Sequence, residues 1–164
     1  MIVEGRAIVL PEDNVDTDVL YPGQFLNVLD PQEMPKYLFE GIDPSLRDQL
    51  GGDTILVSGV NFGTGSSREN VPMAMKAAGI RCVLAASFAR IFHRNAVNLA
   101  LPAIACADAA FAARAGSRIS VDTNTGTIEV DGERFQSQPL PPFMLELFEA
   151  GGLVPWVRRR LEAA

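Results

Sequence analysis

Two short apolar runs separated by a helix-length segment constrain the fold of this chain most strongly. The runs TILVSGV (54–60) and RCVLAAS (81–87) have the length and the aliphatic content of buried strands. A third short run, PAIACA (102–107), follows a second helix-length segment. Strands linked in this way pair in parallel through right-handed crossovers, so the pattern predicts an α/β fold with a parallel core.

The two intervening segments carry helix signals. Pro72 fits only in the first turn of a helix, so the first helix is expected to start near Asn70 and to end at Gly79. Ser87 is the expected N-cap of the second helix. The apolar face of that helix is expected to contain Phe88, Ile91, Phe92 and Leu99.

The N-terminal and C-terminal regions add further elements. Ile2–Leu10 alternates loosely and predicts a first strand, and residues 31–50 are expected to be helical but irregular. Residues 118–135 match a β-hairpin pattern with turns at two glycine-containing sites. The tail predicts an amphipathic helix over 140–152 that is stopped by paired glycines, followed by a short basic end. We see no linker and no repeat, and we expect residues 1–164 to form a single domain.

Composition limits the possible functions. The net charge is −6 with acids and bases interspersed, which argues against a nucleic-acid partner. No apolar run reaches the roughly 18 residues of a membrane span, and the N-terminus lacks a signal-peptide pattern, so we expect a cytoplasmic protein. Cys82 and Cys106 lie in apolar runs and are expected to behave as core residues. Two cysteines and one histidine cannot supply the usual four ligands of a zinc or iron–sulfur site.

The most informative segment is the loop NFGTGSSREN (61–70), between a predicted strand and a predicted helix. Gly63 and Gly65 allow the backbone to turn sharply and to approach a ligand without interference from a Cβ atom. Free N–H groups at the helix start suit an anion, and Arg68 adds a planar fork for a carboxylate or phosphate. The residues predict an anion-binding loop with a reactive hydroxyl, and a simple tight strand–helix connection remains the alternative.

Three familiar loops do not match this segment. The P-loop requires a lysine after its second glycine, and the dinucleotide-binding loop requires a third glycine where this chain has Arg68. A hydrolase elbow requires a histidine and an acid, and His93 is the one histidine in the sequence. We interpret His93 as a helix-surface or interface residue.

Several segments occur together in an order that is typical of one family. They are DNVDTDVLYP (13–22), YLFEGIDP (37–44), GTGSSREN (63–70), AMKAAGIRCVLAASFARIFHRNAVNLALP (74–102) and PLPPFMLELFEAGGLVPWVRRRL (139–161). These segments cover essentially the whole chain and resemble the swivel domain of the aconitase superfamily, as found in isopropylmalate isomerase small subunits. Thr64 departs from many relatives, which carry cysteine or another residue between the two glycines. The implied fold is a swivel-type β/β/α fold with a parallel-strand core and a C-terminal hairpin and helix.

The resemblance implies the small subunit of a hydro-lyase that isomerises 2-isopropylmalate to 3-isopropylmalate by dehydration and rehydration, in leucine biosynthesis. The implied partner is a large subunit that holds a four-iron four-sulfur cluster, and this chain is expected to bind none. Ser66 matches the residue that acts as the base, in its alkoxide form. Ser67 and Arg68 match substrate-binding residues, and Thr17 and Asp18 match positions near the closed active site.

Simpler roles stay open for some of these residues. Ser67 could cap the helix that follows it, and Arg68 could form a structural ion pair with Asp18. Asp16 is interpreted as a residue that closes its own loop.

The segment QFLNVLD (24–30) bears on the substrate. By resemblance, aconitases and homoaconitases carry an arginine in this loop for a third carboxylate, and isopropylmalate isomerases carry an apolar residue. This chain has Asn27 and Val28 there and no arginine. Because burying a carboxylate without a cation is costly, we expect a small hydroxy-dicarboxylate substrate. The alternatives are a homoaconitase or another alkylmalate hydro-lyase small subunit, and a non-catalytic anion-binding regulatory module.

Overall fold

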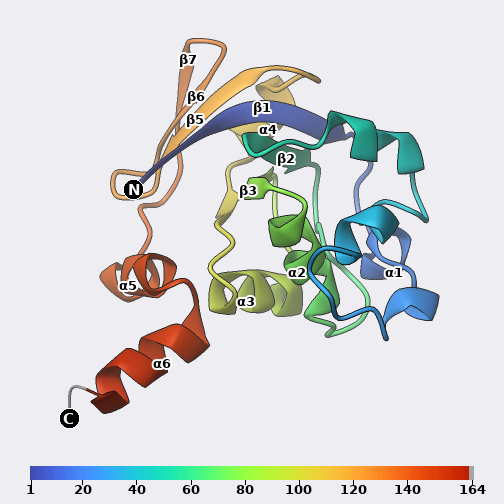
Figure 1. The fold of residues 1–164 in the computed structure, drawn as a ribbon. Helices are drawn as coiled ribbons and strands as arrows, with labels where there is room; N and C mark the ends of the chain where they lie inside the picture. The colour runs from blue at the N-terminus through green and yellow to red at the C-terminus, as the bar shows by residue number, and fades with distance from the viewer. Residues whose placement is uncertain (163–164) are drawn as a thin grey trace.

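A seven-stranded sheet forms the centre of the protein in a computed structural model that describes residues 1–162 (Figure 1). The strand order is β4-β3-β2-β1-β5-β6-β7; the four strands from β4 to β1 are parallel and the remaining pairs are antiparallel. The strands are β1 (Ile2–Leu10), β2 (Thr54–Ser58), β3 (Ile80–Ala85), β4 (Ala103–Ala105), β5 (Arg118–Asp122), β6 (Thr127–Val130) and β7 (Glu133–Gln136). This arrangement confirms the α/β fold, the parallel core and the C-terminal hairpin.

The central strand β2 shows why the sequence predicted the core well. All five of its residues are buried. Leu56 packs in an apolar cluster on one face of the sheet, and Ile55 and Val57 pack in a second cluster on the other face. A strand that is covered on both faces must be apolar at nearly every position, so it appears in the sequence as a continuous aliphatic run.

Helices cover the two faces of the sheet unequally. Residues of α2 (Asn70–Ala77) and α3 (Arg90–Asn98) pack in the cluster that contains Leu56, together with the long segment between β1 and β2. The other face is covered by α4 (Ala107–Ala112), which we did not predict. The observed start of α2 confirms the prediction, since Pro72 occupies the first turn.

The segment between β1 and β2 contains short helices, and the part over residues 31–50 confirms the irregular helical structure expected there. A single turn, α1 (Thr17–Leu20), is followed by the 3-10 helices η1 (Gly23–Phe25), η2 (Met34–Tyr37) and η3 (Pro44–Gln49). Prolines stand in the first turns of η2 and η3, and none of the three extends into a regular α-helix.

The prediction that Ser87 caps α3 was wrong. The helix begins at Arg90, and the residue before it, Ala89, makes no side-chain capping hydrogen bond. The Ser87 hydroxyl instead accepts a hydrogen bond from the Asn61 backbone N–H at 2.8 Å. Ile91, which we assigned to the apolar face, is 47% exposed. Tertiary contacts with the glycine loop therefore determine how this helix begins.

The C-terminal region follows the predicted order. The hairpin β5–β6 continues into β7 through a turn in which Asp131 and Gly132 have φ values of +50° and +89°. Next comes α5 (Pro142–Ala150), which ends at Gly151 in the left-handed conformation. The basic end forms a helix of its own, α6 (Leu153–Glu162).

Both cysteines are free thiols in the described part of the chain. Cys82 is fully buried, and burial raises the pKa of its thiol to about 12, as expected for a core residue. Cys106 is half-buried at the edge of the same cluster. Among residues 1–162, no helix combines the length and the hydrophobicity needed to cross a membrane.

Candidate active site

Two loops meet at the carboxyl ends of β1 and β2. The first leads from β1 to α1, and the second, residues 59–69, leads from β2 to α2. Backbone hydrogen bonds hold the loops together: Thr17 N donates to Thr64 O at 2.8 Å, and Gly63 N donates to Val15 O at 2.9 Å. Because parallel strands end at the same edge of the sheet, side chains that are far apart in the sequence meet here.

Gly63 and Gly65 are necessary for this arrangement. Both have positive φ values, +81° and +100°, which glycine adopts without strain. A Cβ atom on Gly63 would overlap the Phe92 ring, and one on Gly65 would lie 2.6 Å from the Asp16 carboxylate. The structure therefore confirms the sharp turn. Glycine is required at both positions because side chains of this chain lie where a Cβ atom would stand.

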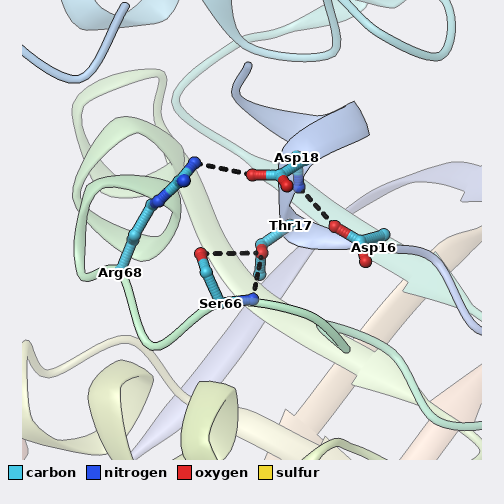
Figure 2. A network of polar contacts seen from close by, with 5 residues as sticks. All are labelled: Asp16, Thr17, Asp18, Ser66 and Arg68. Atoms are coloured by element: carbon cyan, nitrogen blue, oxygen red, sulfur yellow. Dashed lines mark hydrogen bonds and ion pairs between the residues drawn. The ribbon is translucent and has the colours of Figure 1, made fainter. Parts of the chain in front are cut away.

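Ser66 and Thr17 form the central contact of the site (Figure 2). Ser66 N donates to Thr17 Oγ1 at 3.1 Å, and the two hydroxyl oxygens lie 3.3 Å apart. Thr17 is 1% exposed, and Ser66 Oγ is the acceptor within reach of its hydroxyl proton among the described residues. A buried hydroxyl normally donates its proton to the acceptor that is available. With the proton on Thr17 Oγ1, this hydroxyl is positioned to donate a hydrogen bond to Ser66 Oγ.

The backbone after Ser66 offers further donors. Within residues 1–162, the N–H groups of Ser67, Arg68 and Glu69 make no hydrogen bond to the protein. A residue of α3 holds this stretch in place, because Asn95 Nδ2 donates to Ser67 O at 3.0 Å. Free N–H groups just before a helix attract negative charge, so this part of the loop has the donors that an anion-binding loop needs.

Arg68 and Asp18 form an ion pair beside the two hydroxyls (Figure 2), with 2.6 Å between Arg68 Nη1 and Asp18 Oδ1. The side chains are 32% and 58% exposed, so the pair lies at the surface. Asp18 N in turn donates to Asp16 Oδ1 at 2.7 Å, which gives Asp16 the loop-closing role that we assigned to it. Gly23 leaves space for the guanidinium, since a Cβ atom there would lie 3.2 Å from Arg68 Nη1.

The side chain of Ser67 does not cap α2. The helix begins at Asn70, its N-cap residue is Glu69, and no side chain caps it. Ser67 is exposed, so its hydroxyl is available to a ligand.

The segment 24–30 lies against the start of α2, although its predicted substrate-binding residues do not join the network around Ser66. Leu26 O accepts a weak hydrogen bond from Asn70 Nδ2 at 3.4 Å, which ties the segment to the helix. Asn27 is exposed, and Val28 packs partly against the core. Of the seven predicted site residues, the structure thus joins Thr17, Asp18, Ser66 and Arg68 directly, with Ser67 next to them.

Three residues that shape the site were not assigned to it from the sequence: Gly23, Asn70 and Asn95. Gly23 makes room for Arg68, Asn70 holds the segment 24–30, and Asn95 holds the loop at Ser67. The sequence contains no local signal for these contacts, because the partners lie between 28 and 45 positions apart.

The described residues do not offer a metal site. No group of three or more His, Cys, Asp or Glu side chains comes close enough within residues 1–162 to hold an ion. His93 Nε2 lies 3.2 Å from Ala103 O, and Cys82 is enclosed in the core. Neither side chain is directed to a cluster that this chain could hold by itself.

Comparison with known proteins identifies the family. Residues 1–109 match the model of the aconitase C-terminal domain. A 3-isopropylmalate dehydratase small subunit from Methanopyrus kandleri is 45% identical over 96% of this chain and 94% of its own length. The corresponding small subunit from Moorella thermoacetica is 43% identical over 100% of this chain and 99% of its own length.

Solved structures agree with this result. The crystal structure of 3-isopropylmalate dehydratase from Methanocaldococcus jannaschii has a TM-score of 0.92 and 34% identity, and the match covers 99% of this chain and 97% of that one. The chain therefore belongs to the aconitase C-terminal domain family and groups within it with the small subunits of 3-isopropylmalate dehydratase.

Proposed function

We propose that this chain, acting as one domain over residues 1–164, is the small subunit of a 3-isopropylmalate dehydratase and supplies its catalytic base, Ser66. The observation that carries the proposal is the contact of Ser66 with the buried Thr17 hydroxyl, in a loop whose next three backbone N–H groups have no partner among the described residues. A serine hydroxyl needs such donors to act as a base. Family membership supplies the reaction class.

Ser66 Oγ removes the proton from the carbon next to a substrate carboxylate. Before the transfer Ser66 Oγ carries the negative charge of an alkoxide, which a hydrogen bond from the Thr17 hydroxyl, 3.3 Å away, stabilises; the proton then bonds to Oγ and the charge passes to the substrate. The alkoxide is also favoured by the N–H groups that follow Ser66 and by the positive end of α2. Hydrogen bonds to a charged group contribute about 1.5–3 kcal/mol each, so such donors make the alkoxide form of Ser66 considerably more accessible.

Arg68 binds a carboxylate of the substrate. In the free chain the guanidinium is paired with Asp18, which is 58% exposed. An exposed ion pair of this kind contributes about 0.2–1 kcal/mol, so a substrate carboxylate can replace Asp18 or share the guanidinium with it at little cost. The ion pair orients Arg68 before substrate arrives. The structural ion pair with Asp18 and the binding of a substrate carboxylate are therefore compatible roles for Arg68.

The cluster belongs to the partner in this proposal. The family resemblance implies a four-iron four-sulfur cluster, and the described residues of this chain do not fit it. A cluster-bearing large subunit would supply the Lewis acid that activates the substrate hydroxyl. This chain contributes the base, the carboxylate-binding arginine and one wall of the closed site.

A dicarboxylate with an apolar substituent fits the loop best. The segment 24–30 contains no arginine. Aromatic rings pack against it: the Phe25 and Tyr37 rings stack at 4.2 Å between centroids, and Tyr21 packs edge-on against Phe25. Burial raises the pKa of the Tyr21 hydroxyl, and the nearby Tyr37 adds to the effect. A third carboxylate would lack a cation on this side of the site.

The proposal is tested by reconstitution with a cluster-loaded large subunit without oxygen. The chain alone should be inactive, and the complex should isomerise 2-isopropylmalate. Ser66→Ala should lower kcat by about 10²–10⁴-fold, the usual cost of losing a general base, without changing assembly or Tm. Ser45→Ala removes an exposed hydroxyl on η3 and should leave kcat unchanged. A loss smaller than about tenfold for Ser66→Ala, or turnover by the chain alone, would contradict the proposal.

A further inference from the structure

A turn of the chain between η2 and η3 holds the end of α1. The last carbonyl groups of a helix have no partner within the helix, so they need donors from elsewhere. Phe39 N donates to Leu20 O at 2.6 Å. Two residues later, Gly41 N donates to Val19 O at 2.9 Å. Because both donors belong to the turn over residues 38–41, this turn fixes the carbonyl end of α1.

Phe39 has an unusual backbone conformation within the 38–41 turn. Its φ value is +64°, in the left-handed region that bulky residues rarely adopt. Such a conformation is costly and persists only where the surrounding structure determines it. The Phe39 side chain is fully buried, and its carbonyl oxygen accepts from Ile42 N and Asp43 N at 3.1 and 3.0 Å. Contacts on every side therefore hold the turn in this one conformation.

Arg47 of η3 supports the 38–41 turn from the surface. Arg47 Nη1 lies 2.5 Å from Glu40 Oε2 and donates to Leu38 O at 3.4 Å. One guanidinium thus contacts the residues on both sides of Phe39. The Arg47 side chain is 26% exposed, so these contacts are partly protected from water.

Gly41 allows the turn to approach α1 closely. The residue is exposed, yet a Cβ atom on it would lie 2.7 Å from Val19 Cα and 2.8 Å from Val19 O. Both neighbours are backbone atoms, which cannot rotate away as the end of a flexible side chain can. A side chain at position 41 would therefore displace α1 itself, and Thr17 lies two residues before Val19 on this single helical turn.

From these contacts we infer that the strained 38–41 turn is a positioning element for the proposed base, with Gly41 as its critical residue. The turn fixes the end of α1, and α1 keeps Thr17 Oγ1 3.3 Å from Ser66 Oγ (Figure 2). The inference rests on the proposed function, because the turn acts through Thr17 and not through contact with substrate.

Steady-state kinetics of Gly41→Ala in the reconstituted complex test the inference. The kcat should fall by about 10–10²-fold, and by more than KM rises, because a misplacement of about 1 Å at a catalytic group has a cost of this size. Gly52→Ala is the matched control and should keep the kcat of the wild type. It adds the same methyl group at an exposed turn, where no atom lies within 4 Å of the new Cβ atom. A folded Gly41→Ala variant with the kcat of the wild type would overturn the inference.

A double variant tests whether the turn acts through Thr17. The chain with both Thr17→Val and Gly41→Ala should be about as slow as the chain with Thr17→Val alone, because the hydroxyl that the turn positions is already absent. Losses that multiply would also overturn the inference, since the turn would then act on a different group.

The kinetics of Ser66→Ala separate this inference from the proposed function. If Ser66→Ala slows the complex and Gly41→Ala does not, the turn is not a positioning element and the proposed function stands. If Ser66→Ala leaves kcat unchanged, both are wrong. Should Gly41→Ala fail to fold, Arg47→Gln takes its place, because it releases Leu38 and Glu40 without adding an atom next to α1. Its kcat should fall with KM nearly constant, and an unchanged kcat would refute the positioning role.

Discussion

Replacing Thr17 with valine tests the contribution of one buried hydroxyl to the reactivity of Ser66. Valine has nearly the same shape as threonine, and the position is 1% exposed, so packing is preserved. The change removes Oγ1, which accepts from Ser66 N and lies 3.3 Å from Ser66 Oγ. In the proposed mechanism, that one oxygen atom both positions Ser66 and stabilises its alkoxide.

The size of the effect follows from these two contacts. A hydrogen bond to a charged group contributes about 1.5–3 kcal/mol, and each 1.36 kcal/mol is a factor of ten in rate. Loss of the Thr17 hydroxyl should therefore lower kcat by roughly 10–150-fold. The hydrogen bond from Ser66 N is neutral, and its loss should reduce the stability of the chain by about 1 kcal/mol.

The assay is steady-state kinetics of the reconstituted complex, with Tm measured on the small subunit. The expected pattern is a fall in kcat with little change in KM, because the donor favours the reactive alkoxide form of Ser66 and does not contact the substrate. Thr17→Ser keeps the hydroxyl and should recover most of the activity. If Thr17→Val keeps kcat within about threefold of the wild type, or if Thr17→Ser is as slow as Thr17→Val, Thr17 does not stabilise the base.

Three further predictions concern other parts of the chain. Arg68→Lys should lower kcat/KM for the dicarboxylate by at least about tenfold, because an ammonium group cannot bind a carboxylate in the bidentate geometry; comparable kinetics would contradict the assigned role. Asn27→Arg should shift preference from 3-isopropylmalate toward homoisocitrate by more than about tenfold in relative kcat/KM, and an unchanged ratio would mean that another residue faces the substituent. The Cys82 thiol, with its pKa raised from 9.0 to about 12 by burial, should resist a thiol reagent at pH 8 while Cys106 reacts. Since the folded chain holds the neutral thiol, stability should fall as pH rises from about 9 toward 12, measured by denaturation at each pH.

The fold could be predicted where local chemistry determines it. Continuous aliphatic runs predicted β2 and β3 because both faces of these strands are covered, and Pro72 located the start of α2. The prediction failed at Ser87, where local chemistry competes with a tertiary contact. A serine before a helix is a good N-cap, yet its hydroxyl accepts from Asn61 N, which lies 26 positions earlier. Such a contact leaves no signal in a window of the sequence.

The contacts in the candidate site were also difficult to predict from local sequence. The spacing of Gly63 and Gly65 predicted a tight turn with free donors, and the structure has one. The pairing of Ser66 with Thr17 spans 49 positions and that of Arg68 with Asp18 spans 50. Resemblance to a known family brought these residues together, whereas periodicity and composition could not.

The positions of the four residues suggest why the reaction requires two subunits. Thr17 is buried at the start of α1, in the fixed frame of the two hydrogen-bonded loops, while Arg68 and Asp18 stand at the surface. A serine alkoxide is unstable in contact with water, since water competes for each donor and weakens each electrostatic interaction. The frame therefore provides donors that are already oriented, and the exposed ion pair can respond to a substrate carboxylate. In the proposed mechanism, closure by a partner that excludes water would raise the contribution of every one of these contacts, and we expect Ser66 to become reactive only in the assembled enzyme.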